Sequence, residues 1–195
     1  MKILAIIIGV LLIVFVGIQL YSLNSRNTIE KYSFQVVKKY DSFEVRKYKS
    51  GLFTAVDLST NEYSNGSRKG FSILAGYIFG GNDSNQKIAM TSPVRMSIEE
   101  EGMTMMFLIP KEFNKENLPK PNQPDIEFRM EPEQTLAVIS FGGWANSDKI
   151  EEYKNKLKEA LEKQGIEYTN NFSFFGYNPP YDILFRKNEV VVQLK

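Results

Sequence analysis

The same order of strand-like and helix-like segments occurs twice in this chain of 195 residues. In the first half, residues 43–48 alternate between apolar and polar side chains and residues 52–58 are mostly apolar, which predicts two strands. Residues 64–79 then place apolar side chains at helical spacing, and Gly80-Gly81 is typical of a helix end. Residues 104–109 predict the strand that closes this half.

The second half has the same plan. Residues 126–129 and 136–139 predict two strands, and residues 147–164 predict a second amphipathic helix that ends at Gly165. Residues 189–194 predict the closing strand. Because both halves follow the order strand, strand, helix and closing strand, we interpret the chain as an internal duplication of a strand–strand–helix–strand–strand unit.

This duplication predicts the fold class. A unit of this kind leaves one face of its sheet uncovered, and pairing two units buries that face. We therefore expect an α+β fold: a pseudo-twofold, duplicated antiparallel sheet, distorted and barrel-like, with two packing helices and one N-terminal transmembrane helix before it. The expected halves are about 32–110 and 125–195. Met90-Thr91-Ser92-Pro93 and Tyr177-Asn178-Pro179-Pro180 are expected at equivalent places in them.

The N-terminal segment predicts a single membrane anchor. Residues 3–20 carry no charge, and at roughly 1.5 Å per residue they span about 27 Å of lipid bilayer. A cleaved signal peptide is the alternative, but its apolar region is usually shorter and precedes a small-residue cleavage site, which Gln19–Leu23 does not offer. We expect an anchor or signal-anchor at 1–23, a tether at 24–31 and a domain at 32–195. Basic residues flank the segment on both sides, so its orientation stays open.

The composition excludes several kinds of chemistry. The chain has no Cys and no His, which removes disulfides, thiolate metal sites, the commonest metal ligand and the usual general base at neutral pH. It has 24 basic and 23 acidic residues, and Lys2 is the one charge within residues 1–23. The remainder is therefore neutral overall, whereas a nucleic-acid binder needs an excess of Lys and Arg. We expect a binding module, and neither an enzyme nor a nucleic-acid-binding protein.

Several motifs follow one another in an order that resembles the SOUL haem-binding protein family. They are FEVRKY at 43–48, YIFGGN at 77–82, KIAMTSPV at 87–94, FGG at 141–143, GYNPP at 176–180 and RKNEV at 186–190. The resemblance covers about residues 34–194. It implies a pseudo-twofold antiparallel α+β domain, in agreement with the repeat, and non-covalent binding of haem or another tetrapyrrole. More distantly, the chain resembles bacterial domains that bind small hydrophobic ligands.

The resemblance also implies a site along the first helix of the domain. Some family members ligate haem iron through a histidine, which this chain lacks. Others hold haem in an apolar groove, with basic side chains on the propionates. The cofactor-binding residues implied here are Arg68, Phe71, Leu74, Ala75 and Ile78. Arg68 would pair with a propionate, and Lys69 is a second candidate. Where the family can carry another basic residue, this chain has Gly76. No metal-ligating or catalytic residue is expected.

Other interpretations of these residues stay open. The apolar positions within 71–79 fit core packing as well as a groove. Five of the seven methionines lie within residues 90–106 and fit core filling, although a thioether can also ligate haem iron. Gly70 and Gly76 each cost up to about 1 kcal/mol within a helix and indicate a close approach to the sheet or to a ligand. Two further hypotheses are a site for another small hydrophobic molecule and a membrane-tethered protein-interaction domain.

Overall fold

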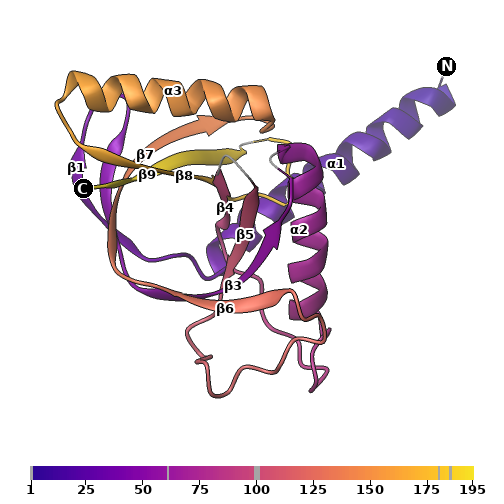
Figure 1. Cartoon of the computed structure of the whole chain (residues 1–195). Helices are drawn as coiled ribbons and strands as arrows, with labels where there is room; N and C mark the ends of the chain where they lie inside the picture. The colour runs from indigo at the N-terminus through magenta and orange to yellow at the C-terminus, as the bar shows by residue number, and fades with distance from the viewer. Residues whose placement is uncertain (1, 61, 99–101, 180, 185) are drawn as a thin grey trace.

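The computed structural model describes residues 2–60, 62–98, 102–179, 181–184 and 186–195 (Figure 1). In chain order, its elements are α1 (Lys2–Thr28), β1 (Phe34–Lys39), β2 (Glu44–Tyr48), β3 (Gly51–Leu58), α2 (Tyr63–Ile78), β4 (Val94–Ile98), β5 (Met103–Leu108), β6 (Ile126–Glu131), β7 (Gln134–Gly142), α3 (Ser147–Lys163), β8 (Tyr168–Gly176) and β9 (Lys187–Leu194). Pro180 of the GYNPP motif lies outside the described residues.

The strands form one curled antiparallel sheet in which the two halves are arranged symmetrically. The strand order is β1-β2-β7-β9-β8-β4-β5-β3-β6. Exchanging each strand of β2–β5 for its counterpart in β6–β9 reverses this order, with β1 as an additional edge strand. The symmetry axis lies between β4 and β8, where Val94 pairs with Gly176 and Met96 with Phe174. The predicted α+β fold with a pseudo-twofold, duplicated sheet is confirmed.

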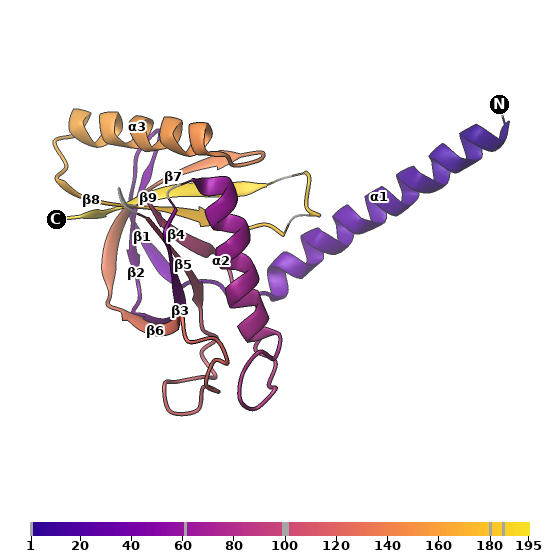
Figure 2. The same cartoon turned by 45° about the vertical axis from the view of Figure 1, so that its right-hand side comes forward.

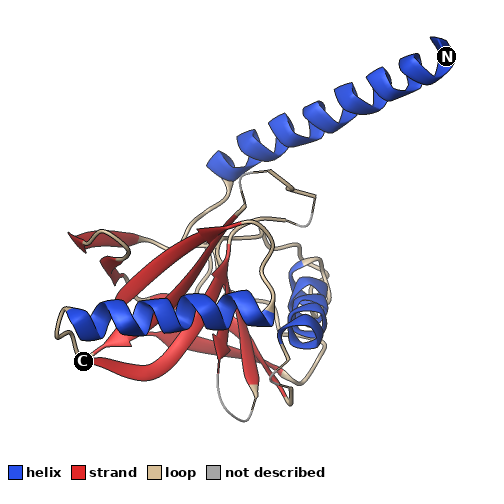
Figure 3. Ribbon diagram, turned by 90° about the horizontal axis from the view of Figure 1, so that it is seen from above, coloured by secondary structure: helices blue, strands red, loops and turns tan. Residues whose placement is uncertain are grey.

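The two helices of the domain pack on one face of the sheet, α2 against β3 and β5 and α3 against β7, β8 and β9 (Figures 1 and 3). Alternate side chains of each strand point to opposite faces. Phe174 and Val190 therefore join the core beneath the helices, whereas the adjacent Phe175 and Val191 join a second core inside the curl of the sheet. Because both faces are covered, every residue of β5 is buried.

The helix ends agree with the sequence patterns. Gly80, directly after α2 and its C-cap Phe79, has φ of +111°, and Gly165, after α3, has φ of +64°. Only glycine adopts this left-handed backbone without a steric cost. At the start of α3, the side chain of Asn146 accepts a hydrogen bond of 2.8 Å from the backbone N–H of Lys149, which caps the helix.

The N-terminal helix α1 extends away from the domain (Figure 2). Its residues 2–19 are long and apolar enough to cross a membrane, and a signal sequence would pass the same test. The helix continues to Thr28, through most of the segment 24–31 in which a tether is expected.

One predicted equivalence between the halves is wrong. Met90-Thr91-Ser92-Pro93 precedes β4, whereas residues 177–179 follow β8. Since β4 and β8 are equivalent strands, the two motifs lie at opposite ends of the repeated unit. In the first half the motif lies between helix α2 and strand β4. In the second half strand β8 lies between helix α3 and the motif.

Candidate ligand-binding site

Helix α2 lies close to the sheet because two of its residues lack side chains. An added Cβ at Gly70 would lie 2.9 Å from Leu58 Cδ1 and 3.0 Å from Met105 Cβ, and one at Gly66 would lie 2.7 Å from Met103 Sδ. These contacts are shorter than side-chain packing tolerates. Gly66 and Gly70 therefore let the helix backbone approach β3 and β5, and the opposite face of α2 remains at the surface.

One side of α2, continued by its C-cap Phe79, carries two exposed aromatic rings and an exposed arginine. Arg68, Phe71, Ala75 and Phe79 recur at intervals of three and four residues, which places them on one side of a helix. Arg68 is exposed, and Phe71 and Phe79 are 40% and 64% exposed. The small Ala75 lies between the two phenylalanines and is buried. We call these four residues the α2 face.

Gly76 leaves the α2 face open on one side. A Cβ added there would meet no heavy atom within 4 Å, apart from the backbone of its own helix. The Phe71 ring rests on the buried Phe107, with ring centroids 5.4 Å apart. Two aromatic rings about 12 Å apart along the helix thus flank a patch without large side chains, and Arg68 lies at one end of it.

In the structure, some residues of the sequence-predicted site are buried in the core and others lie at the surface. Leu74 and Ile78 point into the core between α2 and the sheet, whereas Arg68 and Phe71 reach the surface and Ala75 lies at the boundary. The predicted second basic residue, Lys69, is exposed. Phe79, which sequence reasoning assigned to the helix but not to the site, is the most exposed aromatic side chain there.

The side chains that could ligate haem iron do not lie on the α2 face. Met96, Met103, Met105 and Met106 are buried in the cores, and Met90 packs against one of them. Their packing fits the core-filling interpretation. The chain has no His or Cys, and the α2 face, made of Arg68, Phe71, Ala75 and Phe79, carries no Met or Tyr either.

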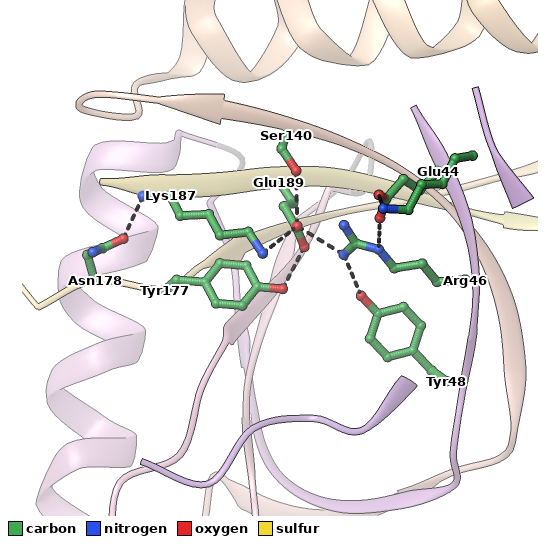
Figure 4. A network of polar contacts seen from close by, with 9 residues as sticks. Glu44, Arg46, Tyr48, Ser140, Tyr177, Asn178, Lys187 and Glu189 are labelled. Atoms are coloured by element: carbon green, nitrogen blue, oxygen red, sulfur yellow. Dashed lines mark hydrogen bonds and ion pairs between the residues drawn. The ribbon is translucent and has the colours of Figure 1, made fainter. Parts of the chain in front are cut away.

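A buried polar network lies elsewhere, where β2, β7 and β9 meet (Figure 4). The carboxylate of Glu189, fully buried, forms ion pairs of 2.9 Å with both Arg46 and Lys187. It also accepts hydrogen bonds from the hydroxyls of Tyr177 at 2.5 Å and Ser140 at 3.1 Å. The buried charge is therefore paired and hydrogen-bonded, as a stable ion pair inside a protein requires.

The network shifts the pKa values of its members in consistent directions. Burial alone would raise the pKa of Glu189, but Lys187 and Arg46 lower it below its usual value. Burial and the negative charge of Glu189 raise the pKa of Tyr48 to about 12 and raise that of Tyr177 as well. At neutral pH the carboxylate is charged and the tyrosines are protonated, so the network joins β2, β7 and β9 through a buried ion pair and a hydrogen bond.

A cavity of about 270 Å³ lies at the end of the domain where β1 begins. Its apolar lining includes Leu52, Leu108 and Met130, and Lys49 and Lys111 lie along its border. This volume is close to the lower end of the range for small-molecule sites. The lining also includes Lys31, Lys115 and the acidic Glu30, whose carboxylate lies 3.8 Å from Lys111 Nζ.

The fold defines a class of duplicated α+β domains in which two helices pack on one curled antiparallel sheet. The description "SOUL heme-binding protein" matches residues 29–193, and the chain belongs to this family. Heme-binding protein 2 of Mus musculus is 29% identical over 157 residues, which are 76% of each chain. Heme-binding protein 1 of Sus scrofa is 27% identical over 176 residues, which are 84% of this chain and 92% of the pig protein.

Solved structures share the fold at much lower sequence identity. The C-terminal domain of EcmrR superposes with a TM-score of 0.61 at 12% identity, covering 83% of this chain and 98% of that domain. A hydrolase from Listeria innocua gives a TM-score of 0.54 at 8% identity, covering 82% and 94%. These similarities extend to the fold alone.

Proposed function

We propose that this chain is a membrane-anchored binding protein that holds haem or another tetrapyrrole non-covalently on the α2 face, without a histidine ligand. The observation that carries the proposal is the pair of exposed rings, Phe71 and Phe79, beside the open position at Gly76 and next to Arg68. Membership of the SOUL family and the names of the relatives support haem as the ligand. The apolar helix at residues 2–19 supports the anchor.

Each residue of the predicted site has a defined part in this proposal. Phe71 and Ala75 would contact the macrocycle, while Leu74 and Ile78 hold α2 on the sheet beneath them. The Arg68 guanidinium would donate to a propionate, a charge-assisted pair of about 1.5–3 kcal/mol. A bound haem supplies the iron, and the protein supplies apolar contact and orientation. We therefore propose a binding module and not a catalyst.

The test is a haem titration of the full chain in detergent, with empty micelles as the blank and the fluorescence of Trp144, the single tryptophan, as the signal. Gly76→Glu places a negative charge next to the propionates and should weaken binding at least roughly tenfold, a loss of about 1.4 kcal/mol. Gly76→Lys supplies the missing basic residue and should strengthen binding. Gly76→Ala, which changes neither charge nor core packing, is the matched control.

The outcome has two independent parts. Equal affinity in the Glu, Lys and Ala variants would show that the α2 face is not the site. An absorption spectrum of six-coordinate haem would show that the iron has protein ligands such as Met or Tyr, which contradicts the ligand-free model.

The cavity favours a second candidate function, the binding of a small amphipathic anion other than haem. Its apolar floor at Leu52 and Leu108 and its border lysines, Lys49 and Lys111, are the supporting observation. Native mass spectrometry of the chain from its own source would detect such a ligand. Loss of that ligand in Lys49→Glu together with Lys111→Glu, with unchanged haem affinity, would assign it to the cavity.

A further inference from the structure

The loop between β8 and β9 carries exposed apolar side chains that haem binding does not use. Tyr181, Ile183 and Leu184 are 47%, 50% and 44% exposed. Trp144, 56% exposed, lies beside the loop because the guanidinium of Arg186 stacks on its ring at 4.0 Å from the centroid. We call Trp144, Tyr181, Ile183 and Leu184 the loop patch. Apolar side chains gathered at one place on a surface mark an interaction site.

Polar residues within the loop hold it in one shape. Arg186 donates hydrogen bonds to the carbonyl oxygens of Pro179 at 3.0 Å and Asp182 at 2.8 Å. The buried carboxylate of Asp182 accepts a hydrogen bond of 2.5 Å from Asn178 Nδ2. The Asn178 side chain in turn accepts one of 2.6 Å from the backbone N–H of Lys187. The loop therefore buries its acidic side chain, Asp182, and exposes Tyr181, Ile183 and Leu184.

The loop is attached to α1 through Gln19. The Gln19 Nε2 donates to the carbonyl oxygen of Tyr181 at 3.2 Å, and its Oε1 accepts from the backbone N–H groups of Ile183 and Leu184, each at 3.3 Å. Gln19 is 7% exposed, whereas the preceding Ile18 is 43% exposed. Figure 2 shows that the N-terminal part of α1 leaves the domain and projects away from it.

Gln19 is also the last residue of the 18-residue span of α1, Lys2–Gln19, that is apolar enough to cross a membrane. It lies 17 residues after Lys2, which corresponds to about 25 Å of helix and thus to most of the hydrocarbon thickness of a bilayer, about 30 Å. When residues 3–18 lie in lipid, Gln19 lies at the membrane surface. The loop patch, bonded to Gln19, then lies at the same level, where Trp and Tyr side chains are enriched in membrane proteins.

We propose that the loop patch inserts into the interface of the bilayer that holds α1 and so fixes the orientation of the domain on the membrane. The partner is lipid because the loop is hydrogen-bonded to α1 at Gln19, the last residue of the span of α1 that is apolar enough to cross a membrane. This inference rests on the membrane anchor of the proposed function. It adds a second contact with the membrane, made by residues more than 120 positions away from the anchor in sequence.

The experiment uses the full chain reconstituted in phosphatidylcholine vesicles, with Trp144 as the reporter. Lipids brominated in the upper part of the acyl chain quench tryptophan only at short range. We expect Trp144 to lose emission in brominated vesicles relative to ordinary ones. Ile183→Asp together with Leu184→Asp should abolish this loss. Val37→Asp is the matched control, because Val37 is an exposed apolar residue on the distant edge strand β1, and it should leave the quenching unchanged.

Resistance to carbonate extraction, measured on the same vesicles, tests the membrane anchor separately from the insertion of the loop patch. A chain that resists extraction but is not quenched, or a double variant that is quenched as strongly as the parent, would overturn docking while the anchor stands. A chain that carbonate removes from the vesicles would refute the anchor, and docking with it.

Discussion

Three glycines of α2 allow a graded test of how the helix packs. Replacing glycine with alanine inside a helix gains about 1 kcal/mol from backbone propensity alone. At Gly76 the added methyl group meets open space, so the whole gain should appear as stability. With about 2–4 °C per kcal/mol for a domain of 150–250 residues, we expect Gly76→Ala to raise the Tm by about 2–4 °C.

At Gly70 the same change should have the opposite sign. The new methyl carbon would lie 3.0 Å from Met105 Cβ, which is fixed to the backbone of β5 and cannot rotate away. Overpacking of this kind costs about 1–3 kcal/mol, so the net effect is a loss of about 1 kcal/mol and about 2–4 °C. At Gly66 the contact is with Met103 Sδ, the far end of a flexible side chain that can move aside. The gain in helix propensity and the smaller cost of overpacking should therefore nearly cancel, and the Tm should change little.

The assay is thermal unfolding of the three variants in detergent, followed by circular dichroism and by Trp144 fluorescence. The expected order of Tm is Gly76→Ala, then Gly66→Ala, then Gly70→Ala. Stabilisation of equal size at Gly70 and Gly76 would refute the reasoning, since it would mean that α2 does not lie as close to β5 as its glycines indicate.

Three further changes test other parts of the structure. Glu189→Gln removes one of the two carboxylates that pair with the buried Arg46 and leaves only the partly exposed Glu44 at 2.8 Å, so it should cost about 3 kcal/mol at pH 7 in urea unfolding. Because the folded pKa of Glu189 is lowered, the difference from the parent should shrink as the pH falls below the unfolded value near 4.5 and vanish only below the folded pKa; a difference at pH 3 as large as at pH 7 would contradict this. Asn146→Ala removes the cap of α3 and should cost about 1 kcal/mol in the same assay, whereas Asn146→Ser should be nearly neutral. Tyr77→Phe removes the hydrogen bond of 2.9 Å to the carbonyl oxygen of Pro119 and should cost about 1 kcal/mol; an unchanged midpoint would show that water replaces the bond.

The strands and helices could be predicted from sequence where the burial of side chains follows a simple period. Residues 52–58 were expected as a strand and form β3, and residues 147–164 were expected as a helix and form α3. The apolar side chains of β3 pack against α2, and those of α3 pack against β7, β8 and β9. Local rules of alternation and capping were enough there, because they agree with the tertiary structure.

Strands β4 and β8 were both missed by the sequence analysis, and β8 is the one with irregular pairing. Its register with β9 shifts between Tyr168 and Phe172, and a shift of this kind interrupts the alternation that marks a strand. The misplaced equivalence of the two proline-containing motifs follows from this omission. A repeat found from apolar patterns gives the order of the strands and helices. Equivalent positions in the two halves can be assigned only when it is known which strands pair with each other.

The candidate site was only partly predictable for a different reason. Helical spacing groups Phe71, Leu74, Ala75 and Ile78 on one broad apolar arc, and the sequence does not say which edge of the arc faces the sheet. The glycines decide it, since α2 packs where Gly66 and Gly70 allow close approach. The contact of Gln19 with the loop patch, across more than 160 positions of sequence, leaves no periodic signal at all.

The absence of histidine determines what kind of binding the α2 face can support. Covering about 200 Å² of apolar surface contributes about 5 kcal/mol, and one propionate pair with Arg68 adds about 1.5–3 kcal/mol. Association itself costs about 4 kcal/mol or more, so affinity weaker than micromolar, about 8 kcal/mol, is expected without an iron–protein bond. Such a site releases its ligand quickly. Fast release suits a protein that exchanges an apolar ligand with a nearby membrane, and the loop patch would keep the domain beside that membrane.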